Sequence, residues 1–170
     1  LNKCSIATFW AGVKVENGGE LIIREAYFYS AYTAVHAMEN AKIDIDVIIV
    51  YGLGKTFGSG IKLEKNVIVS NVKRIKILNV SKAFDISNNN GQNNMFTIDG
   101  GEINNVQYVV ASISRSLILN DLSIENADYG ALLYFCPGSM ITNCYFGYKE
   151  FGIIRGWSPY LMINQNQFAQ

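Results

Sequence analysis

Gly130-Ala131-Leu132-Leu133 is one copy of a four-residue pattern that decides the fold of this chain. The pattern is a small residue, an apolar residue, a free choice and, in most copies, a second apolar residue. It returns every 21 to 26 residues, from 109 to 130 at the shortest and from 34 to 60 at the longest. The other copies are Gly12-Val13-Lys14-Val15, Ala34-Val35-His36-Ala37, Gly60-Ile61-Lys62-Leu63, Ala83-Phe84-Asp85-Ile86, Val109-Val110-Ala111-Ser112 and Gly152-Ile153-Ile154-Arg155. Self-similarity at this period predicts a solenoid, because stacked coils bury a core that one coil cannot bury alone.

A second set of residues repeats in step with the first. Its pairs are Cys4 with Ile6, Ala26 with Phe28, Ile75 with Ile77, Gly101 with Ile103, Leu122 with Ile124, Cys144 with Phe146 and Asn166 with Phe168. Asn79, Asn105 and Asn126 each stand two residues after such a pair, and Asn favours tight corners. We therefore expect two short strands per coil, separated by an Asn corner, with equivalent residues of successive coils about 4.8 Å apart. We also expect the Asn side chains to bond to one another in an internal ladder.

The composition agrees with a folded chain of many short strands. Apolar residues make up 49% and charged residues 16% of the sequence, which is too apolar for disorder. Lys plus Arg equals Asp plus Glu at 14 each, and without a basic stripe we expect no nucleic-acid partner. No apolar run approaches the roughly 18 residues of a membrane helix, so we expect no membrane span. The chain begins without Met and both ends fall inside the repeat, so we expect residues 1–170 to be a single β-helix segment of a longer protein.

Motifs for metals and cofactors are absent from the sequence. Cys4, Cys136 and Cys144 lack metal-ligand spacing, and we expect buried free thiols. A single His and the lack of a Gly-rich phosphate loop leave no recognisable cofactor site. We therefore expect no metal and no cofactor.

The two 26-residue repeats carry extra loops. One loop lies within Glu39–Gly58. The other is Ser87–Met95, which holds Asn88, Asn89, Asn90, Asn93 and Asn94. Insertions in solenoids often gather on a binding face, although a solvated loop is the plainer interpretation.

The third residue of each pattern is expected to face outward, because strand side chains alternate. This column reads Lys14, His36, Lys62, Asp85, Ala111, Leu132 and Ile154. His36, Lys62 and Asp85 should be stacked neighbours that could transfer protons, or simply a solvated charge ladder. The apolar second half is a stripe of the kind that marks subunit contact.

A second outward column reads Trp10, Tyr32, Ser81, Gln107, Asp128 and Glu150. Asp128 and Glu150 should stack on adjacent coils, and two carboxylates about 5 Å apart suit a retaining glycosidase. Crowding would raise the pKa of one of them and supply a proton donor. Glu125, one corner away, could be a third member. The alternative is a set of solvated acids.

Exposed aromatic residues fall into two groups, and flat rings with a polar edge suit sugar faces. The groups are Trp10, Tyr27, Tyr29 and Tyr32, and then Tyr134, Tyr145, Tyr148, Trp157 and Tyr160. As substrate-binding candidates we take Trp10, Tyr27, Tyr29, Tyr32, His36, Tyr134, Tyr145 and Trp157. As catalytic candidates we take Asp128, Glu150, Glu125 and Asp85. Interface packing is the alternative for the aromatic groups.

A coil of this length, with irregular spacing, low charge and many Asn and Tyr, resembles the right-handed pectin-lyase-type parallel β-helix over essentially the whole chain. The likeness is greatest to phage tailspikes that depolymerise bacterial capsule or O-antigen. It implies an all-β right-handed parallel β-helix of about seven coils of 21–26 residues, a polysaccharide or oligosaccharide ligand, a homotrimer, and a place in the virion or outside the cell. No catalytic motif of the family matches, and the clustered Asp residues that hold calcium in pectate lyases are missing.

Two other functions fit the same features. One is a carbohydrate-binding adhesin or structural shaft without catalysis. The other is a secreted, monomeric polysaccharide lyase or hydrolase of the pectin-lyase type. The sequence leaves open whether the sugar is cut, by a glycoside hydrolase or a lyase, or only bound.

Overall fold

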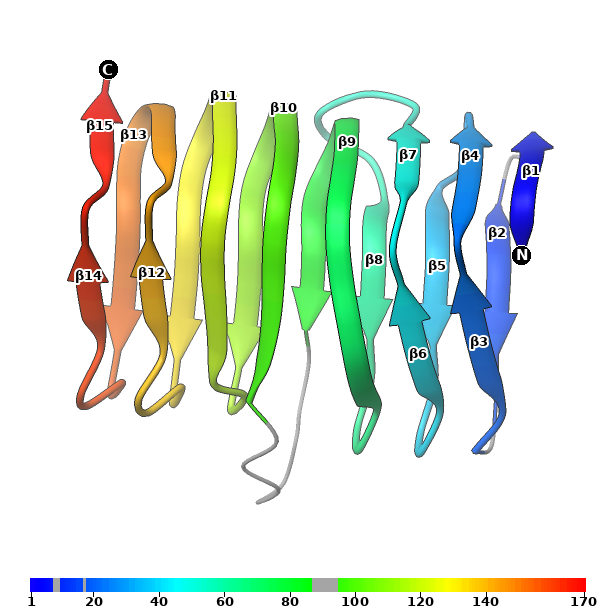
Figure 1. Cartoon of the computed structure of the whole chain (residues 1–170). Helices are drawn as coiled ribbons and strands as arrows, with labels where there is room; N and C mark the ends of the chain where they lie inside the picture. Colours follow the sequence, from blue (N-terminus) through cyan, green and yellow to red (C-terminus); the bar gives the residue numbers. More distant parts are fainter. Residues whose placement is uncertain (8–9, 17, 87–94) are drawn as a thin grey trace.

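The computed structural model describes residues 1–7, 10–16, 18–86 and 95–170, and the regular structure of this part is all β-strand (Figure 1). No helix in these residues is long and apolar enough to cross a bilayer. The strands are β1 (Asn2–Ala7), β2 (Ala11–Val15), β3 (Glu20–Ile23), β4 (Glu25–Tyr29), β5 (Thr33–Ala37), β6 (Lys42–Ile45), β7 (Ile48–Tyr51), β8 (Ser59–Leu63), β9 (Ile68–Ile86), β10 (Phe96–Ile113), β11 (Leu117–Tyr134), β12 (Met140–Thr142), β13 (Tyr145–Gly156), β14 (Met162–Asn164) and β15 (Gln167–Ala169).

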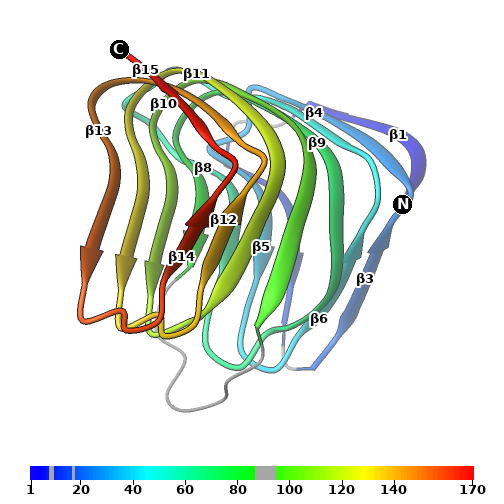
Figure 2. The same ribbon diagram turned by 60° about the vertical axis from the view of Figure 1, so that its left-hand side comes forward.

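The strands form the three faces of a parallel solenoid of about seven turns (Figures 1 and 2). The first face runs through β3, β6, β12, β14 and the beginnings of β9, β10 and β11. The second contains β1, β4, β7, β15, the middles of the long strands and the start of β13. The third contains β2, β5, β8 and the ends of the long strands. The chain rises along the first two faces, descends along the third and advances from right to left in Figure 1, which makes the coil right-handed.

The predicted repeat is confirmed residue by residue on the third face. Val13 pairs with Val35, which pairs with Ile61, and the register continues through Phe84 and Val110. The apolar pairs of the second face are also in register. The expectation of two strands per coil was wrong, because the first face adds a third. Its early strands, β3 and β6, have four residues each and only two buried side chains apiece, so their pattern is weak.

The core is a continuous apolar column enclosed by the three faces. Its largest fully buried aromatic side chains are Phe28, Phe84 and Phe146. Each buried Leu, Ile or Phe side chain contributes about 1.5–3 kcal/mol by leaving water. Parallel pairing fixes the distance between coils, and the apolar column fills the interior.

The Asn residues occupy the corner between the second and third faces, but outside the core. Asn79, Asn105 and Asn126 have φ values of 58°, 53° and 52°, the left-handed conformation that Asn tolerates well. Asn105 Nδ2 donates to Asn79 Oδ1 at 2.7 Å, whereas Asn126 Nδ2 donates to Asn104 Oδ1 at 3.1 Å. The predicted bonding between Asn side chains is therefore confirmed for Asn79 and Asn105 and not for Asn126. Asn105 and Asn126 are exposed, so the prediction that the ladder is internal was wrong. The interior at this corner is filled by apolar side chains, and the amides therefore face solvent.

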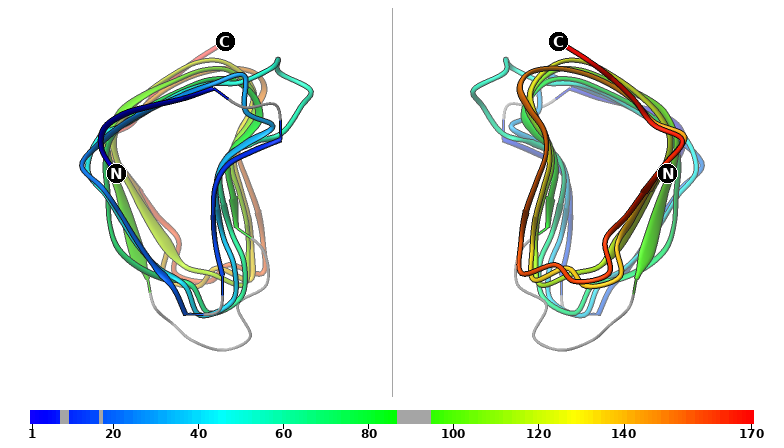
Figure 3. Two further views of the ribbon diagram at one scale, coloured as in Figure 1. Left: turned by 90° about the vertical axis from the view of Figure 1, so that its right-hand side faces the viewer. Right: turned by 90° about the vertical axis from the view of Figure 1, so that its left-hand side faces the viewer.

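The extra loop expected within Glu39–Gly58 is residues 52–58, which join β7 to β8. It projects from the corner between the second and third faces (Figure 3). The second predicted loop, with its five Asn residues, lies outside the described residues except for Met95. Cys136 and Cys144 are buried free thiols as expected, whereas Cys4 is only half-buried.

Candidate functional site

An aromatic cavity of about 400 Å³ lies beside the loop of residues 52–58. Trp10 and Tyr32 line it from neighbouring coils, and Leu53 and Phe57 line it from the loop. The Thr33 amide donates to the Trp10 carbonyl at 2.9 Å, which fixes the coil-to-coil spacing here. The two rings lie 6.3 Å apart between centroids, and Trp10 remains 74% exposed. The solenoid therefore presents an open aromatic surface to the solvent.

We number the coils from the N-terminus, so that β1 and β2 lie in the first, β3–β5 in the second, β6–β8 in the third, and β9, β10 and β11 form the fourth, fifth and sixth. Backbone hydrogen bonds hold both ends of this loop against the fourth coil. The Gly54 amide donates to the Asn79 carbonyl at 2.8 Å, and the Phe57 amide closes a turn on Gly54 at 3.0 Å. The Ser81 amide then donates to the Phe57 carbonyl at 2.8 Å. Leu53 and Phe57 come from this third coil and line the cavity together with Trp10 and Tyr32 of the first two coils.

A polar cleft of about 230 Å³ adjoins the aromatic cavity and shares Tyr32 with it. Its other main lining residues are Thr33, Thr56, Ser59, Lys62, Ser81, Lys82 and Asp85. Lys82 Nζ lies 3.0 Å from Asp85 Oδ1, so the one carboxylate of the cleft is paired with an ammonium. Hydroxyls and ammoniums beside an aromatic surface can bind a ligand that has apolar faces and many oxygens.

His36 lies in the next outward column of the third face. It pairs in register with Lys62, which pairs with Asp85, so the predicted stack of these three residues is confirmed. His36 Nε2 lies 2.7 Å from Glu64 Oε1, and Lys62 Nζ lies 3.7 Å from the same oxygen. The column is therefore a polar network in which Glu64 joins the coils of His36 and Lys62.

Asp128 and Glu150 stand on adjacent coils, because Tyr129 and Phe151, the residues that follow them, are register partners. Each carboxylate has another partner. Asp128 Oδ1 lies 2.6 Å from Lys55 Nζ. Glu150 Oε2 accepts a 2.6 Å hydrogen bond from the Tyr129 hydroxyl, which raises the pKa of Tyr129 to about 12.

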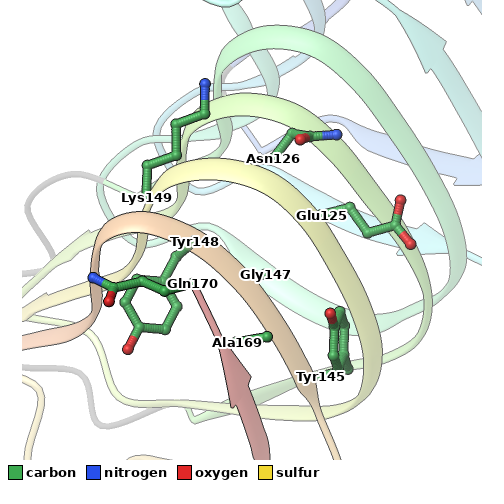
Figure 4. A pocket seen from close by; sticks show the side chains of 8 residues that line it. All are labelled: Glu125, Asn126, Tyr145, Gly147, Tyr148, Lys149, Ala169 and Gln170. Carbon is green, nitrogen blue, oxygen red and sulfur yellow. The ribbon is translucent and has the colours of Figure 1, made fainter.

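Glu125 and Tyr145 lie together at a separate pocket of about 390 Å³ (Figure 4). They come from neighbouring coils, and Lys149 lies on the other side of the pocket. The Glu125 carboxylate accepts a hydrogen bond of 3.2 Å from the Asn104 amide. This second pocket thus contains one catalytic candidate and one binding candidate, far from Trp10 along the solenoid.

The remaining aromatic candidates are dispersed. The Tyr27 hydroxyl donates to Glu25, which raises the pKa of Tyr27. Tyr29 stacks on Tyr51 with a centroid separation of 5.5 Å. Tyr134 is exposed at the end of the third face, and Trp157 follows that face with 85% exposure. The structure thus brings Trp10 and Tyr32 to the aromatic cavity and Tyr32 and Asp85 to the adjoining polar cleft, with His36 two coils from Asp85 in the same column. The other candidates lie elsewhere.

The predicted apolar stripe is in register on the third face. Ala111, Leu132 and Ile154 are consecutive partners, all half-buried. A ladder of stacked rings lies beside it on the same face, with 4.9 Å between the Tyr108 and Tyr129 centroids.

The loop residues Leu53, Lys55, Thr56 and Phe57 were missed by the sequence reasoning. The 26-residue spacing indicated an insertion there, but nothing in the pattern showed which side chains would face the cleft. In the described part of the chain, no three His, Cys, Asp or Glu side chains gather where they could hold a metal.

The fold and the cleft define a parallel β-helix with an aromatic cavity beside a hydroxyl-rich cleft. No protein-family model, no curated protein and no solved structure matches the chain.

Proposed function

We propose that this chain is the sugar-binding part of a β-helix of the phage tailspike type, and that it holds a bacterial surface polysaccharide beside the loop of residues 52–58. The observation that supports this most is the open aromatic cavity joined through Tyr32 to the polar cleft. Sugar rings have apolar faces and hydroxyl edges, and the two surfaces match these in turn. The proposal places the protein in the virion or outside the cell.

Binding is favoured over cleavage by the state of the acids. A glycosidase needs two carboxylates directed at one glycosidic bond. Asp128 is paired with Lys55, Glu150 with Tyr129, and Asp85 with Lys82. Cleavage by Asp128 and Glu150 is therefore the second candidate, and it rests on their adjacent positions in the register.

The test is affinity for a panel of purified bacterial capsules and O-antigens, measured by calorimetry. Removing a central aromatic anchor typically costs about 2 kcal/mol or more, roughly 30-fold in affinity. We expect Trp10→Ala and Phe57→Ala each to weaken binding by that order. Phe135→Ala is the matched control, because Phe135 is also exposed but lies outside the cleft. Equal losses in all three variants, or no polysaccharide bound by the wild type, would refute the proposal.

Cleavage is tested on the same sugars by the release of reducing ends. If the wild type cuts and either Asp128→Asn or Glu150→Gln is inactive while still folded, the acid pair is catalytic. If both variants cut at the wild-type rate, the acid pair has no catalytic role.

The apolar stripe supports a further part of the proposal, a homotrimer that associates through the third face. Apolar stripes that reach the surface often mark such contacts, and Ala111, Leu132 and Ile154 are each half-buried in the single chain. Leu132→Glu should then lower the mass measured by light scattering, and an unchanged mass would count against the contact.

A further inference from the structure

Lys55 binds a residue three coils away from its own coil. Lys55 belongs to the loop before β8, whereas its partner Asp128 is in β11. The register places Gly58 of this loop and Asp128 in one corner column, separated by β9 and β10. Three coil steps of about 4.8 Å give roughly 14 Å, more than a lysine side chain spans. The loop itself must therefore lean along the axis, and Figure 1 shows it passing over the top of β9, where that strand bends from the second face to the third.

The contact is specific in geometry. Lys55 Nζ donates to Asp128 Oδ1 at 2.6 Å and to the Asn126 carbonyl at 3.1 Å. The Lys55 and Asp128 side chains are 19% and 27% exposed. A charge-assisted hydrogen bond in such a partly desolvated place is stronger than an ordinary surface ion pair.

The same loop forms one wall of the aromatic cavity. Leu53 and Phe57, on either side of Lys55, line that cavity with Trp10 of the first coil and Tyr32 of the second. The loop thus contacts the sixth coil through Lys55 and faces the first two coils through its apolar side chains. Its Gly54 and Gly58 have φ values of 138° and 66°, so part of its conformation depends on glycine.

We propose that Lys55 and Asp128 form a latch that positions the loop, and through it the Leu53 and Phe57 wall of the sugar cavity. They are positioning residues, because they act through the loop and not on the ligand. The inference rests on the proposed function for its effect on sugar affinity. Its structural part, the placement of the loop against Trp10, is independent of any ligand.

The test uses Lys55→Met and Asp128→Asn, singly and together, in a Trp157→Phe background. The chain has two Trp residues, so this background leaves Trp10 as the only tryptophan fluorophore. Acrylamide quenching and the emission maximum of Trp10 then report whether the Leu53 and Phe57 wall still covers Trp10. Calorimetry reports the polysaccharide affinity. Lys55→Arg restores a donor that can reach both acceptors. Lys42→Met removes an exposed lysine of the first face and is the control.

We expect each single variant to alter Trp10 quenching and to weaken polysaccharide binding about 10-fold. The double variant should be no worse than either single variant, since residues that act as one unit are not additive. Lys55→Arg should recover the wild-type values and Lys42→Met should keep them.

Unchanged Trp10 quenching in both single variants, or additive losses in the double variant, would overturn the latch. Such a result leaves the proposed function standing if the wild type binds sugar and Trp10→Ala does not. If the wild type binds none of the sugars, the proposed function fails, and the Trp10 measurement alone still decides the latch. Asp128→Asn leaves the loop sequence intact, so it remains informative if Lys55→Met folds poorly.

Discussion

Gly58→Ala is expected to be strongly destabilising, because the side chain it adds has no space. Gly58 has a φ of 66° and ends the loop at the cleft. A Cβ at this position would lie 1.7 Å from the carbonyl oxygen of Tyr32. That oxygen accepts the 2.8 Å hydrogen bond from the Ser59 amide that joins two coils. The coils that contain Tyr32 and Gly58 must therefore move apart at the point where the polar cleft and the aromatic cavity meet.

Two costs add in this variant. The left-handed conformation costs an alanine about 1–2 kcal/mol. The displacement needed to relieve the clash breaks the hydrogen bond to Tyr32, and an unmade buried bond costs about 1–3 kcal/mol. We therefore expect the free energy of unfolding to fall by roughly 2–5 kcal/mol.

Gly138→Ala is the matched control for conformation. Gly138 has a φ of 70°, but a Cβ there would meet no atom within 4 Å. It should lose only the conformational cost, about 1–2 kcal/mol. Both variants would be unfolded in urea and followed by circular dichroism and by tryptophan fluorescence, because coils of a solenoid can unfold separately. If the two variants lose equal stability, the steric explanation is wrong.

Three further predictions concern single side chains. Glu150→Gln should lower the pKa of Tyr129 from about 12 towards the ordinary tyrosine value, because the charged acceptor is lost. If the hydrogen bond between Tyr129 and Glu150 is absent, ultraviolet titration of the phenolate would show no such change. Phe84→Ala should reduce the free energy of unfolding by about 3–5 kcal/mol, since Phe84 is fully buried, and a loss below about 1 kcal/mol in urea unfolding would contradict this core position. Burial raises the pKa of the Cys136 thiol, so this thiol should react with a disulfide reagent only when the protein unfolds. Cys4 is half-buried and should react in the folded protein. Equal reaction rates of the two thiols at neutral pH would contradict this prediction.

The coil register of the third face could be predicted from sequence because each coil of that face has a small residue where the neighbouring coil comes close. Its small residues include Gly60 and Gly130, and a Cβ on Gly130 would lie 1.9 Å from the carbonyl oxygen of Gly152 on the next coil. Close approach of this kind demands small residues at fixed positions and leaves a visible pattern. The first face has no such marker in its early strands. Glu20–Ile23 and Lys42–Ile45 alternate over only four residues each, too few to stand out from chance alternation.

The Asn corner shows what local chemistry can and cannot predict. The corner position of Asn79, Asn105 and Asn126 was foreseen because Asn tolerates the left-handed conformation. Which way their amides point depends on the neighbouring coils, and apolar side chains such as Val80 and Val106 already fill the interior there. The amides therefore bond along the outer surface, and one of them takes Asn104 as its acceptor.

The sequence could not predict the partners of the two acids, Asp128 and Glu150, for a different reason. Register alone correctly puts Asp128 and Glu150 on adjacent coils. The partner of Asp128 is Lys55, in an insertion 73 residues earlier. The repeat pattern does not predict that this insertion leans along the axis. For these acids to cut a sugar, Lys55 would have to release Asp128 and Tyr129 would have to release Glu150, so that both carboxylates could face one bond. The proposed binding of sugar at the aromatic cavity requires neither rearrangement. The Lys55–Asp128 ion pair that would hinder catalysis is the same pair that we propose holds the cavity wall in place.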